Sequence, residues 1–148
     1  MLVIDRTQEL GIRRAAEEAY PNECCGFLIG AVANGVRTVT RIQESANERS
    51  DSLRNRFLIG PREMLRTERE LQEGESVLGF FHSHPDAPAR PSEYDRSHAW
   101  PWYSYLIVAV RQGRSEELTN WRLQEDRSGF TLEQMEVRNE ATGPSELA

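Results

Sequence analysis

The stretch SVLGFFH, residues 76–82, places the tightest limit on how this chain can fold. It is a compact apolar run of strand length, with Gly74 just before it and Pro85 shortly after it. A short run without polar alternation predicts a strand that is covered on both of its faces, as in the centre of a sheet. The sequence therefore predicts that this segment is a central strand with both faces covered.

Two histidines lie at the carboxyl end of this predicted strand. His82 and His84 are separated by one residue, and side chains at positions i and i+2 of a strand project from the same face, about 6 to 7 Å apart. Two imidazoles placed in this way can bind one ion at Zn–N distances of about 2.0 to 2.1 Å. Pro85 cannot continue the strand, so the chain turns away at the carboxyl end, where sites in open sheets usually lie.

The segment after the histidines predicts the start of a helix. Ser92-Glu-Tyr-Asp95 has the residue types of an N-cap and an N3 position. In a structural interpretation, Ser92 accepts from an unpaired amide and Asp95 interacts with the positive end of the helix dipole. In a functional interpretation, Asp95 is a third metal ligand and Ser92 presents a hydroxyl beside it. The two interpretations are compatible, and two histidines with one carboxylate would leave a fourth zinc position for water, as in catalytic sites.

The remainder of the sequence predicts a mixture of helices and strands. The pair Asn34-Gly35 lies between the apolar runs 25–33 and 36–42 and predicts a β-hairpin. One helix is expected to be capped by Thr7 and to bury Leu10, Ala15, Ala16 and Ala19, and a second is expected over 61–72 with Met64, Leu65 and Leu71 on one side. Further strands are expected at 57–59, 105–110, 119–124 and 130–137, and a polar loop at 43–56.

Composition excludes several classes of protein. The 148 residues fit a single domain, expected over residues 1–138, followed by a disordered tail over 139–148. A net charge of −6, with acids and bases interspersed, argues against nucleic acid as the partner. No apolar run approaches the roughly 20 residues that span a bilayer, and the N-terminus lacks the pattern of a signal peptide. We therefore expect a cytoplasmic protein that does not enter a membrane.

A resemblance to a known family follows from these motifs. The pattern His-x-His-Pro, six residues, Ser-x-x-Asp, which covers residues 82–95, is similar position for position to the metal-binding motif of the JAMM (MPN-plus) metalloproteases. Segments similar to other blocks of that family lie in the family order at Pro21–Gly30, at Asn47 with Arg56–Pro61, and at 105–110. The resemblance implies an α/β, single-domain JAMM/MPN fold of the cytidine-deaminase-like type, with a mixed curved β-sheet flanked by helices.

The resemblance also implies a function. It assigns one zinc ion per chain to His82, His84 and Asp95, the roles of general base and acid to Glu23, and support of the oxyanion to Ser92. The family cleaves peptide or isopeptide bonds that follow the C-terminal Gly-Gly of ubiquitin-like proteins. Because the chain is a bare single domain, it resembles the small prokaryotic branch, similar to CysO-cysteine peptidases. Those enzymes act on small ubiquitin-fold sulfur carriers, so the expected partner is such a carrier and the expected context is cysteine biosynthesis.

Several alternatives stay open at this stage. A non-catalytic binding scaffold of the same fold is the second hypothesis, although the complete ligand set with Glu23 favours an enzyme. The reaction could release an amino acid from a carrier, trim a carrier precursor or remove a carrier from lysine. Exposed edge strands are compatible with a homodimer. The remaining interpretations are a surface or outer-shell role for His98, packing for Cys25, a covering wall for Trp100, Trp102, Tyr103 and Tyr105, and contact with an acidic carrier face for Arg49, Arg54 and Arg56.

Overall fold

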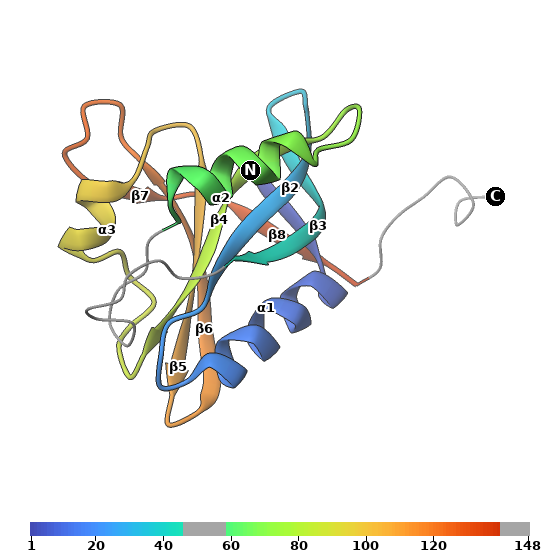
Figure 1. Ribbon diagram of the computed structural model, residues 1–148. Helices are drawn as coiled ribbons and strands as arrows, with labels where there is room; N and C mark the ends of the chain where they lie inside the picture. The colour runs from blue at the N-terminus through green and yellow to red at the C-terminus, as the bar shows by residue number, and fades with distance from the viewer. Residues whose placement is uncertain (46–58, 140–148) are drawn as a thin grey trace.

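A mixed eight-stranded sheet organises residues 1–45 and 59–139, which are the residues that the computed structural model describes (Figure 1). The strand order is β7-β6-β5-β4-β2-β3-β1-β8. The strands are β1 (Leu2–Asp5), β2 (Cys25–Ala33), β3 (Val36–Ser45), β4 (Ser76–Pro85), β5 (Ser104–Arg111), β6 (Arg114–Leu123), β7 (Phe130–Leu132) and β8 (Met135–Arg138). The helices are α1 (Arg6–Ala19), α2 (Pro61–Arg69) and α3 (Glu93–His98).

Strand β4 lies in the middle of the sheet, as its apolar sequence predicts. It pairs antiparallel with β2 and parallel with β5, and every residue after Ser76 is buried. The register places His82 beside Cys25 of β2 and beside Ile107 of β5. The carboxyl end of β4 is therefore fixed from both sides, which gives the two histidines a rigid support.

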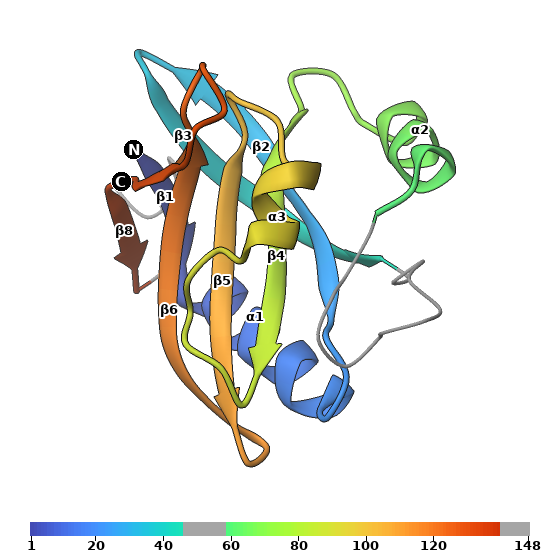
Figure 2. The same ribbon diagram turned by 90° about the vertical axis from the view of Figure 1, so that its left-hand side faces the viewer.

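The two faces of the sheet carry separate cores. Helix α1 covers one face, where Ile12 packs with Leu28, Phe81 and Leu106. Phe27, Phe80 and other apolar residues form a second cluster, against which Met64 of α2 packs. Figure 2 shows α1 behind the sheet and α3 in front of it. The predicted α/β class, with a mixed sheet flanked by helices, is confirmed.

The sheet is strongly curled, because its two edge strands, β7 and β8, follow each other directly in the sequence. Strands β7 and β8 lie at opposite ends of the strand order, yet only Glu133 and Gln134 separate them. Three peptide steps span at most about 11 Å, so the two ends of the sheet must approach each other. The amide of Glu133 donates to Asn120 O, and the amide of Leu2 donates to Gln134 O, both at 2.9 Å. The single strand expected at 130–137 is wrong for this reason.

The start of α1 differs from its prediction. Asp5, not Thr7, is the N-cap: its carboxylate accepts from the Gln8 amide at 2.7 Å, and the Gln8 side chain accepts from the Asp5 amide at 2.9 Å. This reciprocal capping box satisfies two amides that Thr7 could not satisfy together. Ile12 is buried in the resulting helix, whereas Leu10, which was expected in the core, is 54% exposed.

Other boundaries follow from local turns. The hairpin at Asn34-Gly35 is confirmed, with φ values of 53° and 76°, the positive values that a type I′ turn requires. Gln112-Gly113 makes a second such turn, with φ values of 49° and 84°, so β6 begins at Arg114, earlier than expected.

Helix α2 ends at Arg69, three residues before the predicted end, and Leu65 on it is half-exposed. Of the polar loop expected over 43–56, residues 43–45 belong to β3. Ile59, expected in a strand, has no regular structure. The other residues of those two segments, with Arg49, Arg54, Arg56 and the tail from residue 140, lie outside the described residues. None of the helices in the described part is long and apolar enough to cross a membrane.

Candidate metal centre

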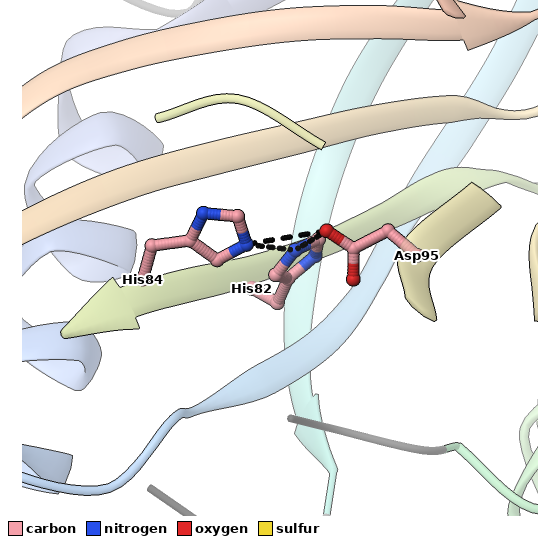
Figure 3. Close-up of side chains that lie close together, drawn as sticks. All are labelled: His82, His84 and Asp95. Atoms are coloured by element: carbon pink, nitrogen blue, oxygen red, sulfur yellow. Dashed lines mark hydrogen bonds and ion pairs between the residues drawn. The ribbon is translucent and has the colours of Figure 1, made fainter. Parts of the chain in front are cut away.

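Three side chains that the sequence singles out converge on one point. The Nε2 atoms of His82 and His84 are 3.1 Å apart, and Asp95 Oδ2 lies 3.4 Å from the first and 3.2 Å from the second (Figure 3). All three residues are buried. They form a group whose ligand atoms could hold a metal ion. Figure 3 shows both imidazoles on β4 turned toward the carboxylate, which comes from α3.

The geometry of this group fits a tetrahedral ion. Ligands bound at about 2.0 to 2.1 Å in tetrahedral geometry lie about 3.3 to 3.4 Å from one another. The three measured separations, from 3.1 to 3.4 Å, are close to that value. Two imidazole nitrogens and a carboxylate oxygen are also the donor types that zinc prefers. The residues present therefore fit a zinc ion.

The capping box of α3 aims the carboxylate. Ser92 Oγ accepts from the Asp95 amide at 3.0 Å, and the Ser92 amide donates to Asp95 Oδ2 at 2.8 Å. The oxygen that receives this hydrogen bond is the same one that faces the histidines. The structural and functional interpretations of Ser92 and Asp95 thus describe a single arrangement, because the cap holds the donor oxygen in place.

The tautomer of His84 is set by the loop that follows β4. Its Nδ1 lies 2.9 Å from the carbonyl oxygen of Pro88, which can only accept, so Nδ1 carries the proton. The lone pair of Nε2 is then directed toward Asp95 and His82. A backbone carbonyl that fixes the tautomer is typical of metal-binding histidines.

Burial and charge act in opposite directions at the centre. Burial lowers the pKa of His82, although the Asp95 charge acts to raise it, so the neutral imidazole that a metal requires is favoured. Burial alone would raise the pKa of Asp95, but the charges and hydrogen bonds of His82 and His84 outweigh it and hold the pKa well below its usual range. Asp95 is thus held as a carboxylate that faces the two imidazole nitrogens.

Glu23 lies beside this group, just before β2 begins. Its Oε1 is 3.9 Å from His84 Nε2, and its Oε2 is buried without a hydrogen-bond partner among the described residues. Burial, followed by the charge of Asp95, raises the pKa of Glu23 to about 9. Cys25, two residues after Glu23, is buried, with its Sγ 3.6 Å from Ser45 O, in line with its expected packing role.

The sequence did not predict the residue that holds the backbone next to Glu23 in place. Ser83, between the two histidines, points to the opposite face of β4, and its Oγ accepts from the Cys24 amide at 2.9 Å. The Ser83 amide also donates to the Cys24 carbonyl at 3.1 Å. The period-two alternation of β4 puts Ser83 opposite the histidines, but only the β2–β4 register shows which amide it meets.

The other candidates lie around the centre. His98 is exposed and stacks on Tyr94, with ring centroids 4.0 Å apart, and lies outside the three-residue group. A surface position for His98 is therefore confirmed. Among the aromatic residues expected to wall the site, Tyr105 is buried, whereas Trp100 and Trp102 are exposed. A cavity of about 710 Å³ opens beside the centre, and His82 and Asp95 form part of its lining.

Comparisons with known proteins agree with this geometry. A curated relative from Haloferax volcanii, named desampylase, is 35% identical over 99 residues, which are 66% of this chain and 69% of the relative. The solution structure of a protein from Desulfitobacterium hafniense has a TM-score of 0.82 and 31% identity, covering 95% of this chain and 94% of that one. The crystal structure of a JAB1/MPN domain protein from Archaeoglobus fulgidus, at 24% identity, shares the fold, with a TM-score of 0.57 and coverage of 94% and 100%.

These likenesses confirm the resemblance to the JAMM/MPN family and to its small prokaryotic branch. The model of the family Prok-JAB, prokaryotic homologs of the JAB domain, matches residues 8–124. That range contains Glu23, both histidines, Ser92 and Asp95. The chain belongs to the family of prokaryotic homologs of the JAB domain.

Proposed function

We propose that this protein is a zinc-dependent peptidase of the JAMM type. It hydrolyses the peptide or isopeptide bond that follows the C-terminal Gly-Gly of a small ubiquitin-like sulfur-carrier protein. The observation that carries the proposal is the convergence of His82, His84 and Asp95 at tetrahedral spacing, with Glu23 beside them. The relative named desampylase supports a hydrolase of this type.

A zinc ion with only three protein ligands would have a fourth coordination position available for water. A zinc ion held by His82, His84 and Asp95 would supply a Lewis acid that lowers the pKa of a bound water toward about 7. The ligand side chains come from a central strand and a capped helix, so their positions are held by the core of the domain. Their burial excludes competing bulk water and strengthens electrostatic interactions at the centre.

Glu23 moves the proton in the proposed reaction. Its Oε1 lies 3.9 Å from His84 Nε2, one of the ligand atoms, so a water held at the ligand group would be within reach of this carboxylate. The hydroxyl group of the water joins the glycine carbonyl carbon, and the carboxyl then returns the proton to the nitrogen as the C–N bond breaks and the amine leaves. The raised pKa of Glu23 favours the protonated form that the second step requires. A zinc ion held by the three ligands would add positive charge beside this carboxyl and would favour the ionised form that the first step requires.

Ser92 stabilises the charge that develops on the substrate. Its Oγ accepts the Asp95 amide through a lone pair, so the hydroxyl hydrogen is left to donate. A donor aimed at a developing oxyanion contributes about 10²- to 10³-fold in rate. The side chain therefore acts as both the cap of α3 and the donor.

Metal analysis and hydrolysis assays test this function. We expect about one zinc per chain by mass spectrometry of metals, and release of the leaving group from a ubiquitin-like protein that ends in Gly-Gly and is extended at its C-terminus. Glu23→Gln should keep the zinc and lose hydrolysis, because the amide cannot accept the proton.

His98→Ala is the matched control, since His98 is exposed and lies outside the ligand group. It should keep the zinc. A protein without affinity for zinc, or an active Glu23→Gln variant, would show the mechanism to be wrong. Binding of the carrier without any cleavage would instead indicate a non-catalytic scaffold.

A further inference from the structure

The cavity beside the metal centre has a mostly apolar lining that includes several aromatic rings. Its side chains come from α2, α3, the segment between α3 and β5, strands β4, β5 and β7, and the turn between β6 and β7. Phe80 lies between Tyr103 and Tyr105, with ring centroids 5.2 and 5.6 Å away, and Tyr105 makes an edge contact with Phe130 at 5.7 Å. Rings that pack on one another in this way form a firm wall. The lining therefore suits an apolar side chain of a ligand.

One guanidinium interrupts this apolar lining. Arg127 belongs to the turn between β6 and β7 and has a φ of 62°, a left-handed value that is unusual for a residue with a side chain. Its carbonyl oxygen accepts from Arg96 of α3 at 3.0 Å, so the turn is tied to the helix that carries Asp95. The guanidinium carbon lies 5.4 Å from the centroid of the Trp100 ring. The backbone thus holds Arg127 at the cavity.

The charge of Arg127 has no acidic partner in the described part of the chain. None of the ion pairs found there involves its side chain, although the residue is half-buried and lines the cavity. Burial raises the pKa of Tyr105 to about 12, and the charges of Arg127 and Asp95 both act on this hydroxyl, in opposite directions. Tyr105 is therefore within electrostatic reach of both groups. A half-buried guanidinium with free donors is suited to bind a carboxylate of a ligand.

The proposed reaction indicates which part of a substrate would enter the cavity. The acyl side of the bond ends in Gly-Gly, so about 7 Å of chain next to the metal centre carries no side chain. Those two glycines cannot fill a cavity of about 710 Å³ that begins at His82 and Asp95. The nearest side chain to the bond that breaks is the one on the leaving side. The cavity is therefore placed to receive the leaving group.

We propose that this cavity binds a leaving group that has an apolar side chain and a free α-carboxylate, and that Arg127 is the residue that binds this carboxylate. The inference rests on the proposed function and deepens it. It identifies the substrate class as a carrier with a short C-terminal extension, as opposed to a carrier linked to a lysine side chain. An isopeptide conjugate presents an alkyl stem with backbone amides at this position and offers no carboxylate to Arg127.

Binding to the metal-free protein tests the cavity independently of catalysis. The probes are acetyl-Gly-Gly-Phe and its C-terminal carboxamide, followed by NMR chemical-shift titration, which detects weak binding. We expect the acid to bind about tenfold more tightly than the carboxamide, a difference of about 1.4 kcal/mol, because a hydrogen bond between two charged groups is stronger than one to a neutral amide. Arg127→Gln should bring the ratio close to one, and Arg127→Lys should recover part of it. Arg14→Gln, an exposed change on α1, is the matched control and should keep the full ratio.

The outcomes separate this inference from the proposed function. Equal binding of acid and carboxamide, no shift at cavity residues, or a ratio unchanged by Arg127→Gln would each overturn the role of Arg127. If the zinc-loaded protein cleaves Gly-Gly isopeptides faster than C-terminal extensions, the substrate class is wrong and the hydrolase stands. If the carboxylate preference holds but no conjugate is cleaved, the cavity assignment stands and the hydrolase is wrong.

Discussion

Single residues at the centre combine a structural and a chemical role. The clearest case is Ser92, whose Oγ caps α3 and lies beside the donor group for the metal. Its amide holds the Asp95 oxygen that faces both histidines. Because one side chain serves both purposes, substitutions at such positions must be designed to separate folding from chemistry.

Replacement of Ser92 can separate the cap from the hydroxyl donor. Ser92→Ala should reduce the stability of the protein by about 1 kcal/mol and kcat by about 10²- to 10³-fold. Ser92→Gly should lose the same rate, but only a few tenths of a kcal/mol, since glycine is tolerated at an N-cap. Urea unfolding and steady-state kinetics on both variants measure the two effects. Equal rates in the wild type and Ser92→Gly would remove the hydroxyl from the mechanism.

The buried thiol of Cys24 should make the folded protein less stable at alkaline pH. Burial raises the pKa of its thiol from 9.0 to about 11. The folded state therefore holds this proton more tightly than the unfolded state. The stability that results is complete below pH 9 and is lost as the pH rises toward 11. A shift of this size corresponds to about 2 to 3 kcal/mol.

Thermal unfolding of the wild type and of Cys24→Ala at pH 8 and pH 10.5 checks this prediction. The stability advantage of the wild type should shrink by about 2 kcal/mol between the two values. An advantage that stays constant would show that the thiol ionises in the folded protein as easily as in the unfolded chain.

Pairs of elements bring the reactive groups together. Strand β4 carries both histidines, α3 carries the carboxylate, and the segment just before β2 carries Glu23. The β2–β4 pairing sets the position of Glu23, since Cys25 pairs with His82 and Ser83 holds both the amide and the carbonyl of Cys24. The proton-transfer group is thus positioned by the same strand that provides two ligands.

Ser83 should therefore act as a positioning residue. Ser83→Ala leaves the buried Cys24 amide without its side-chain acceptor, which costs about 1 to 3 kcal/mol. We expect kcat to fall as Glu23 moves, while zinc content and KM stay close to wild type. Ser83→Thr keeps the hydroxyl and should recover most of kcat. A loss of zinc in Ser83→Ala would instead show that Ser83 supports the ligands themselves.

The elements of the centre differ in how well the sequence predicts them. The group of His82, His84 and Asp95 is encoded within 14 residues, by strand alternation, a proline stop and a capping box, so local rules suffice. The proximity of Glu23 was inferred only through the family resemblance, because it depends on the pairing of two strands distant in sequence. The N-cap at Asp5 was missed because Thr7 has a similar propensity, and only the reciprocal contact with Gln8 distinguishes them.

At the scale of the whole molecule, a polar cluster around Glu133 holds the curled sheet together. The cluster lies toward the opposite end of β4 from the metal centre. Glu133 Oε1 accepts from Ser104 Oγ at 2.6 Å and from Asn120 Nδ2 at 2.8 Å. Arg37 is buried nearby, and its guanidinium carbon lies 4.0 Å from the centroid of the Trp102 ring. The charge of Glu133 stabilises the charged form of Arg37. Ser104 pairs with Gly79, at the opposite end of β4 from His84. The cluster joins the neighbouring strands β5 and β6 to Arg37 of β3 and to the turn between β7 and β8, which are distant in the strand order, so no local pattern predicts it.

Removal of Glu133 should therefore weaken the fold and leave the ligand group intact. Glu133→Ala takes away the acceptor of three side-chain donors, on Ser104, Asn120 and Arg122, so we expect a loss of about 2 to 3 kcal/mol in urea unfolding. Glu136→Ala, which removes an exposed carboxylate paired with Arg138, should change stability by less than about 0.5 kcal/mol. Zinc content per folded chain should be the same in both variants and in the wild type, since Ser104 and His84 lie at opposite ends of the β4–β5 pair. A loss of zinc in folded Glu133→Ala would mean that closure of the sheet and the geometry of the centre are coupled, and that the two ends of β4 do not act independently.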